Sequence, residues 1–218
     1  MKVLGVSGSP IPNSNTDHAV QAVLHSTGLE TEFIKLSEYA VAPCMACLGC
    51  LDTNRCVIED DGILLAEKVK EADALVIGGY TSYSSIDART KSFIERLYPL
   101  RHIKGFMRGK PGGAVITSAI PENAEELPPA FDTAKNAIMF YMMEEGMSFQ
   151  GAVRVKGNPP CIKCGHGDLC DMSGIKMLFG PNATIESVGV NLFEKQQDAV
   201  TAAAELGKKI AHALLEKQ

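Results

Sequence analysis

Four cysteines near residue 50 form the group of side chains in this sequence with the clearest chemical signature. They are spaced Cys44-x2-Cys47-x2-Cys50-x5-Cys56. Cysteines at successive x2 intervals can wrap one small face of an iron–sulfur cube, and the fourth can close the same cluster. Zinc sites more often pair two CxxC knuckles across a longer gap, while a redox disulfide and unrelated buried thiols are further alternatives. The spacing favours a [4Fe–4S] cluster bound by these four thiolates.

A second group consists of Cys161, Cys164 and Cys170. Three thiolates are one short of a full ligand set. His166 would complete a Cys3His zinc site, while Asp168 or a ligand from another chain would complete a second cluster. A redox dithiol and a set of unligated thiols are the alternatives without metal. A second metal site is therefore one of several interpretations that the sequence leaves open here.

A loop with many hydroxyl and amide groups follows the first predicted strand and precedes a predicted helix. Gly8 permits a tight turn there, and backbone N–H groups at the start of a helix can bind a phosphate without a cationic side chain. Neither a G-x-G-x-x-G fingerprint nor the lysine of a Walker loop is present, which favours a mononucleotide cofactor. An ordinary capped strand–turn–helix is the alternative. The residues predicted to surround the phosphate are Ser7, Ser9, Pro10, Asn13, Asn15 and Thr16.

Short apolar strands alternate with amphipathic helices along the chain, as in a parallel sheet covered on both faces. The pattern predicts a single flavodoxin-like α/β domain over residues 1–218, with a five-stranded parallel sheet in the order 2-1-3-4-5 and helices on both faces. Two cysteine-bearing insertions interrupt it, the cluster-binding segment 42–59 and the second cysteine loop 156–194. Both follow a strand and precede a helix, so both are predicted to lie at the carboxyl edge of the sheet. Strands are expected near 2–6, 31–36, 74–79, 113–117 and 149–155, and helices near 15–26, 60–72, 86–97, 129–145 and 195–216.

Two further polar loops follow the third and fourth predicted strands. In a flavodoxin-like sheet these loops flank an isoalloxazine ring whose phosphate lies over the first strand. Tyr83 is expected to stack on the ring, and simple packing is the alternative for this tyrosine. The residues predicted to contact the ring are Thr81, Ser82, Tyr83, Ser84, Ser85, Thr117 and Ser118.

The composition limits the classes of partner. The chain has 218 residues with 45% hydrophobic and 22% charged residues, as in an ordinary globular protein. Its net charge of −5 argues against nucleic acid or an anionic membrane surface as a partner. No apolar run approaches the roughly 20 residues that a membrane span needs, and no signal peptide is apparent. We therefore expect a cytoplasmic protein, in which seven cysteines serve as metal ligands or redox groups rather than as a disulfide framework.

Taken together, these motifs resemble those of the iron–sulfur flavoprotein family, a branch of the NADPH-dependent FMN reductase superfamily. The resemblance rests on Ser7-Gly8-Ser9-Pro10 with Asn13-Ser14-Asn15-Thr16, the four-cysteine set, Asp60-Asp61, and Lys91-Ser92-Phe93-Ile94-Glu95-Arg96. It implies FMN at the phosphate loop and a [4Fe–4S] cluster on the four cysteines. It also implies a homodimer or homotetramer, in which the cluster of one subunit lies near the FMN of another. The second cysteine group is not explained by this resemblance.

The resulting functional prediction is an oxidoreductase that passes electrons from a ferredoxin-like donor through the cluster to FMN. A small acceptor such as oxygen, peroxide or a quinone-like molecule would then take them. One alternative is an NAD(P)H-dependent FMN or quinone reductase whose cysteines hold no cluster, and another is a non-enzymatic electron carrier. No constellation for side-chain acid–base catalysis is recognisable, so no catalytic residue is predicted.

Overall fold

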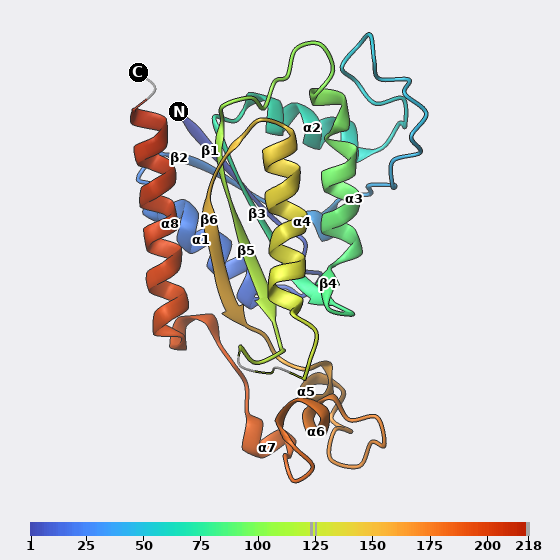
Figure 1. Cartoon of the computed structure of the whole chain (residues 1–218), viewed down its shortest axis with the longest axis vertical. Helices are drawn as coiled ribbons and strands as arrows, with labels where there is room; N and C mark the ends of the chain where they lie inside the picture. Colours follow the sequence, from blue (N-terminus) through green and yellow to red (C-terminus); the bar gives the residue numbers. More distant parts are fainter. Residues whose placement is uncertain (123, 125, 217–218) are drawn as a thin grey trace.

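The computed structural model describes residues 1–122, 124 and 126–216, and shows a twisted parallel sheet between two layers of helices (Figure 1). Five parallel strands lie in the order β2-β1-β3-β5-β6, and a sixth, β4, pairs antiparallel with the end of β3. The predicted order is therefore confirmed, with β4 as an additional short strand. The strands are β1 (Lys2–Ser7), β2 (Glu30–Lys35), β3 (Ala74–Ser82), β4 (Ser85–Ile86), β5 (Pro111–Ser118) and β6 (Ser148–Lys156).

Two apolar cores hold the layers together, one on each face of the sheet. One face packs against α1 (Asn15–Ser26) and α8 (Gln197–Leu215), while the other packs against α2 (Asp61–Glu71), α3 (Ala88–Arg96) and α4 (Ala130–Glu144). The central strands are buried on both sides, which explains their near-continuous apolar sequences. None of the helices in the described part of the chain combines the length and apolar character needed for a membrane crossing.

The helices α1, α2 and α3 begin at side-chain caps that the sequence supplies. Ser14 caps α1 in a capping box with Asp17, and Asp60 caps α2 by accepting a hydrogen bond from the backbone N–H of Gly62. Asp87 caps α3 through the backbone N–H of Thr90. These caps place the first turns of α1 and α3 next to the loops that follow β1 and β3, where the cofactor contacts are predicted.

The second cysteine loop contains structure that the sequence pattern does not predict. Three short helices interrupt it, α5 (Pro160–Cys164), α6 (Gly174–Phe179) and α7 (Ile185–Val188), followed by the 3-10 turn η3 (Phe193–Lys195). Two other 3-10 turns, η1 (Leu36–Glu38) and η2 (Tyr98–Leu100), follow β2 and α3. In Figure 1 the segment with α5, α6 and α7 hangs from the carboxyl ends of the strands, as predicted.

The first cysteine loop does not lie where the sequence analysis placed it. Residues 42–59 extend away from the carboxyl edge of the sheet and lie beside the C-terminal end of α3, at the other end of the molecule from α5–α7 (Figure 1). The reason is a set of contacts with the segment that follows α3, including hydrogen bonds from the Asn54 side chain to the carbonyl oxygens of Pro99 and His102 at 2.8 and 2.6 Å. The two cysteine groups are therefore far apart within one chain.

Candidate functional site

A buried arginine closes the base of the first cysteine loop. Arg96 is only 1% exposed, and its Nη1 and Nη2 atoms lie 2.6 and 2.7 Å from the two carboxylate oxygens of Asp60. Nη1 also donates to the carbonyl oxygen of Ala42 at 2.9 Å, and Nη2 donates to that of Ile58 at 3.3 Å. Because these two carbonyl groups stand at the two ends of the loop, one guanidinium ties both ends to α3.

The neighbouring acidic pair completes this closure, which we call the Arg96 clip (Arg96, Asp60 and Asp61). Asp60 accepts a hydrogen bond from the backbone N–H of Ala42 at 2.8 Å, and Asp61 accepts one from that of Ala40 at 2.7 Å. The hydrogen bonds from Arg96 are the main reason why the pKa of Asp60 lies below its usual value, although partial burial opposes them. The carboxylate is therefore held in its charged form, as a bidentate arginine pair requires.

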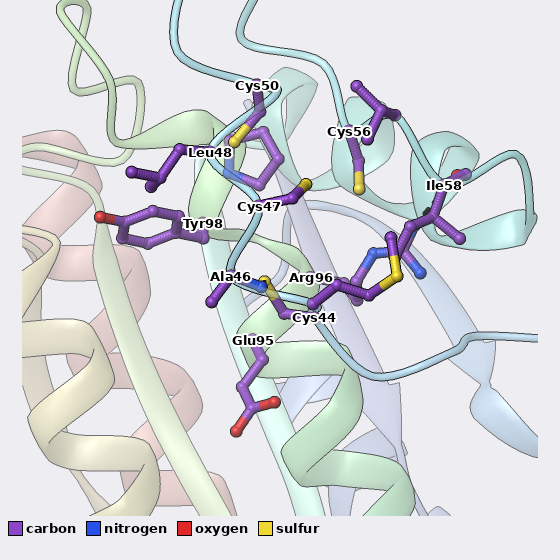
Figure 2. Close-up of a pocket in the computed structure, with 13 residues that line it drawn as sticks. Cys44, Ala46, Cys47, Leu48, Cys50, Cys56, Ile58, Glu95, Arg96 and Tyr98 are labelled. Carbon is purple, nitrogen blue, oxygen red and sulfur yellow. Dashed lines mark hydrogen bonds between the residues drawn. The ribbon is translucent and has the colours of Figure 1, made fainter.

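The four cysteines line one cavity within this loop, together with Arg96 (Figure 2). Cys50 is buried, Cys44 and Cys56 are half-buried, and Cys47 is exposed. Burial raises the pKa of Cys50, and the nearby Cys56, Cys44 and Cys47 raise it further. Four adjacent thiolates repel one another in the absence of metal, and iron ions would remove this repulsion by binding the deprotonated sulfur atoms.

The backbone of the loop is bent at residues that are not glycine. Ala46, Leu48 and Asn54 have φ values of 53°, 56° and 53°, in the left-handed region that costs L-residues energy. Such conformations persist where the surrounding contacts impose them, and they concentrate at ligand sites. Here they turn the chain sharply on either side of Cys47 and before Cys56, so that the cysteines share a single cavity.

The donor set agrees with a cluster, but the side chains are not yet gathered around a metal position. The cavity has a volume of about 20 Å³, which is the space of roughly one water molecule. Within the described ranges of the chain, no three His, Cys, Asp or Glu side chains are arranged to hold a metal ion. Two observations favour a fit: the four thiols line one cavity, and Nε of Arg96, a residue of the same cavity wall, is buried without a hydrogen-bond partner among the described residues.

The phosphate loop is held in shape by a buried carboxylate. Asp17 accepts a hydrogen bond from the Ser7 hydroxyl at 2.6 Å and one from the backbone N–H of Ser14 at 3.0 Å. Lys35 lies 2.5 Å from the same carboxylate and also donates to the carbonyl oxygen of Ile11 at 2.9 Å. The sequence analysis did not identify Asp17 or Lys35, although a conventional capping box at Ser14 would have indicated the aspartate.

Several of the residues predicted to bind FMN are brought together at this edge. The Thr16 and Thr117 hydroxyl oxygens lie 2.8 Å apart, and the Thr81 hydroxyl donates to that of Ser118 at 3.1 Å. The Ser9 hydroxyl accepts from the backbone N–H of Ile11 within the phosphate loop, while Pro10 and Asn13 are exposed there. The ends of β1, β3 and β5 thus meet around one polar surface, and the FMN assignments of these residues stay predictions.

The turn between β3 and β4 presents an aromatic side chain under backbone strain. Tyr83 and Ser84 have φ values of 48° and 59°, the left-handed conformation that type I′ hairpin turns use and that Asn-Gly usually supplies. The Tyr83 side chain is fully exposed, between Ser82 and Ser85. A strained turn with an exposed aromatic ring is suited to contact a planar ligand or a neighbouring subunit.

Asn15 has a role that the sequence did not indicate. Its side-chain amide donates to the carbonyl oxygens of Lys156 and Asn191 at 3.1 and 2.8 Å, and its oxygen accepts from the backbone N–H of Phe193 at 3.0 Å. These bonds tie the start of α1 to residues 157–193, which we call the cap. The base of the cap is closed by reciprocal hydrogen bonds between Asn158 and Asn191 at 2.7 and 3.0 Å.

The second cysteine group lies inside the cap without a gathered ligand set. Cys161 and Cys164 belong to α5, which ends at Gly165 with a φ of 75°. Asp168 serves the cap itself, because its carboxylate accepts from the backbone N–H of Ile185 at 2.7 Å. Within the described residues, Cys170 and His166 join no group of three side chains that could hold a metal ion. The interpretations of this group as metal site, dithiol or inert thiols remain untested predictions.

Comparison with known proteins identifies the family. Residues 1–132 match the family described as NADPH-dependent FMN reductase. The chain therefore belongs to this family of flavin-dependent oxidoreductases. The match ends before the second cysteine group, so the cap lies outside it.

The relatives and the solved structures narrow the position within the family. The chain is 38% identical over 130 residues to an iron–sulfur flavoprotein of Methanocaldococcus jannaschii and 31% identical over 129 residues to one of Methanosarcina thermophila. These matches cover 58% of the chain in both cases, and 66% and 68% of the relatives. Among solved structures, RosB with a bound riboflavin-phosphate intermediate has a TM-score of 0.66 at 15% identity, over 99% of this chain and 79% of RosB. A flavodoxin from the domain Archaea has a TM-score of 0.54 at 16% identity, over 99% of both chains. The relatives associate the chain with iron–sulfur flavoproteins, and the structures support its flavodoxin-like fold.

Proposed function

We propose that this protein is an oxidoreductase with FMN and a [4Fe–4S] cluster. It would take electrons from a ferredoxin-like donor through the cluster to FMN and on to a small acceptor such as oxygen, peroxide or a quinone-like molecule. The observation that carries the proposal is the cavity lined by Cys44, Cys47, Cys50 and Cys56 in a loop that Arg96 closes at its base.

The residues that would hold the two cofactors belong to separate parts of the chain. The backbone N–H groups before α1, with Ser9 and Thr16, would hold the FMN phosphate, while the Tyr83 turn and the Thr117 loop would flank the ring. The four thiolates would hold the cluster. When bound, FMN exchanges one or two electrons and the cluster exchanges one, which suits a converter between a one-electron donor and a two-electron acceptor.

The distance between the two sites favours a homodimer or homotetramer. The predicted flavin contacts precede α3, whereas Arg96 and the cysteine cavity lie at its end. A helix of nine residues is about 13 Å long at ~1.5 Å per residue, so a single chain separates the cofactors by at least one helix length. The cap also exposes large apolar side chains, namely Leu169, Met172, Met177 and Val190. We propose that a second copy covers these side chains and brings its own cluster near this FMN.

Anaerobic purification followed by iron, sulfide, zinc and flavin analysis tests the cofactor content. We expect one FMN, four iron and four sulfide per chain. Cys50→Ala should remove the iron and retain the FMN, whereas the control Cys164→Ala should retain both the cluster of the first cysteine group and the FMN. Zinc in place of iron, or full iron content in Cys50→Ala, would contradict the proposed cluster.

The FMN site is tested separately by a double substitution. Ser9→Ala with Thr16→Ala should weaken FMN binding by roughly 2–3 kcal/mol, because each lost hydrogen bond contributes about 1 kcal/mol. Isothermal titration of the flavin-free protein measures this directly. Unchanged affinity would show that the phosphate lies elsewhere.

The family match favours one second candidate, an NAD(P)H-dependent FMN reductase. The two candidates differ in the electron donor that reduces the flavin. Anaerobic addition of NADPH, without any iron–sulfur donor, should leave the flavin absorbance nearly unchanged if the donor is ferredoxin-like. Rapid bleaching on addition of NADPH would favour the second candidate.

A further inference from the structure

Arg96 has one N–H group that the protein itself does not use. A guanidinium carries five N–H donors. The two on Nη1 bond to Asp60 and Ala42, and the two on Nη2 bond to Asp60 and Ile58. The fifth, on Nε, is buried and has no hydrogen-bond partner within the described residues. A buried donor of a charged group that lacks a partner is costly, so its retention calls for an explanation.

The side chain that carries the unused donor lines the cysteine cavity. Arg96 lines this cavity together with the four cysteines, and Figure 2 draws it among the residues of the cavity wall. The side chain has little freedom to turn elsewhere, because Asp60 holds its far end in a bidentate pair and Gly62 packs against it. A Cβ atom at Gly62 would lie only 2.8 Å from Nη2. The position of Nε is therefore set mainly by Asp60 and Gly62.

We propose that Arg96 is a positioning residue for the cluster, with its Nε–H donating a hydrogen bond to a cluster sulfur or to the Cys56 thiolate. This inference rests on the proposed function, since it assigns a partner to the cavity that the cluster would fill. The same side chain then performs two tasks through separate atoms. Its Nη atoms close the loop, and its Nε–H contacts what the loop binds.

This arrangement has a consequence for the cluster that loop closure alone does not have. Reduction adds negative charge to the iron and sulfur atoms, and a buried cation with an N–H group directed at a sulfur stabilises that charge. Arg96 should therefore shift the reduction potential to a more positive value. A residue that only closed the loop would alter the amount of cluster bound without altering the potential of the cluster that remains.

Two variants separate these roles. Arg96→Lys keeps the positive charge but lacks the Nε–H group and the planar fork, whereas Asp60→Asn weakens the clip and leaves Nε–H in place. We would reconstitute both under anaerobic conditions, measure iron, sulfide and FMN per chain, and titrate the potential by electron paramagnetic resonance. FMN content reports whether the fold is intact, because the phosphate loop is a separate part of the chain.

We expect Arg96→Lys to hold a cluster of more negative potential than wild type, and Asp60→Asn, which removes a nearby negative charge, to hold one whose potential is not more negative. Loss of iron in Arg96→Lys with the remaining cluster at the wild-type potential would be explained by loop closure and would overturn the assignment of Nε–H. Equal potentials and equal iron content in the two variants would overturn the assignment of Nε–H. Equal loss of iron in both variants, with the remaining clusters at the same potential, would overturn it as well, because the clip alone would then explain the effect. A wild-type protein without iron would instead refute the proposed function, and this inference with it.

A measurement that retains Arg96 tests the proposal even if the Arg96 variant fails to fold. Arginine labelled with ¹⁵N is incorporated into protein carrying Arg55→Lys, which removes the arginine within the cysteine loop itself. Electron spin echo envelope modulation of the reduced cluster then detects nitrogen close to it. A ¹⁵N coupling that disappears with unlabelled arginine supports the proposal, and the absence of any such coupling overturns it.

Discussion

Gly8, in the predicted phosphate loop, allows β1 to pass directly over the start of α3. A Cβ atom on Gly8 would lie 1.9 Å from the Thr90 hydroxyl oxygen and 3.0 Å from each carboxylate oxygen of Asp87. Neither neighbour is free to move, since both are buried and joined by hydrogen bonds of 2.9 and 2.7 Å. Gly8 cannot easily withdraw either, because its N–H group donates to the carbonyl oxygen of Gly78 at 2.8 Å. We therefore predict that Gly8→Ala destabilises the protein.

The size of the effect follows from two contributions. Overpacking of a well-filled interior costs about 1–3 kcal/mol. Displacement of Thr90 also weakens a hydrogen bond to the buried Asp87 carboxylate, which adds about 1–3 kcal/mol. Because Asp87 is buried, its pKa is already above the usual value, and the hydrogen bonds from Thr90 contribute most among the groups that favour the charged form. The expected decrease in the free energy of unfolding is therefore roughly 2–6 kcal/mol.

Urea unfolding of the flavin-free protein at pH 7 measures this decrease. Gly28→Ala is the matched control, because Gly28 has a φ of 66° but nothing within 4 Å of the position that a Cβ atom would take. It should cost only about 1 kcal/mol, through backbone strain alone. Adding Thr90→Ala to Gly8→Ala should restore part of the lost stability, since it removes the atom that clashes. A Gly8→Ala protein within about 0.5 kcal/mol of wild type would refute the steric argument.

Two further predictions concern the loops. The pKa of Asp60 is lowered chiefly by Arg96. The contribution of Asp60 to stability is therefore complete above the ordinary pKa of the carboxyl group, and it is lost as the pH falls through the lower pKa of the folded state. Acid unfolding of Asp60→Asn should show less pH dependence than wild type below about pH 4, and an identical acid profile would contradict this. Ser84→Gly should stabilise the protein by about 1 kcal/mol, because glycine adopts the left-handed conformation of this turn without strain. A decrease in melting temperature would instead show that the serine side chain stabilises the turn.

Local patterns were sufficient to predict the scaffold. Apolar runs between turn residues located all five parallel strands, and the helix that follows Ser14 has the predicted bounds at 15–26. The two-residue strand β4 and the helices of the cap were missed. Both are too short for hydrophobic periodicity to appear, and the cap is held in part by polar contacts such as the Asn158–Asn191 pair.

The contacts that organise the site depend on residues distant in sequence, and local patterns do not report them. Arg96 stands 36 positions from Asp60, and Asn15 stands 176 positions from Asn191. The place of the first cysteine loop was predicted wrongly for the same reason. The rule that a segment between a strand and a helix lies at the carboxyl edge holds for a short connection, whereas this loop is long enough to be drawn to the end of α3 by Arg96 and Asn54.

The two cysteine segments are attached to the sheet domain in the same way, and this shared arrangement affects the proposed electron path. Each is an insertion closed at its base by side chains of the scaffold, Arg96 for the first and Asn15 for the second. Each leaves large apolar side chains exposed, with Met45 and Leu48 in the first loop and Leu169 and Met172 in the cap. Because the two insertions lie at opposite ends of one chain, they can meet only between chains. Self-association would then bury these surfaces and shorten the gap between cluster and flavin in the same step, so that dilution to monomers should slow flavin reduction without releasing either cofactor.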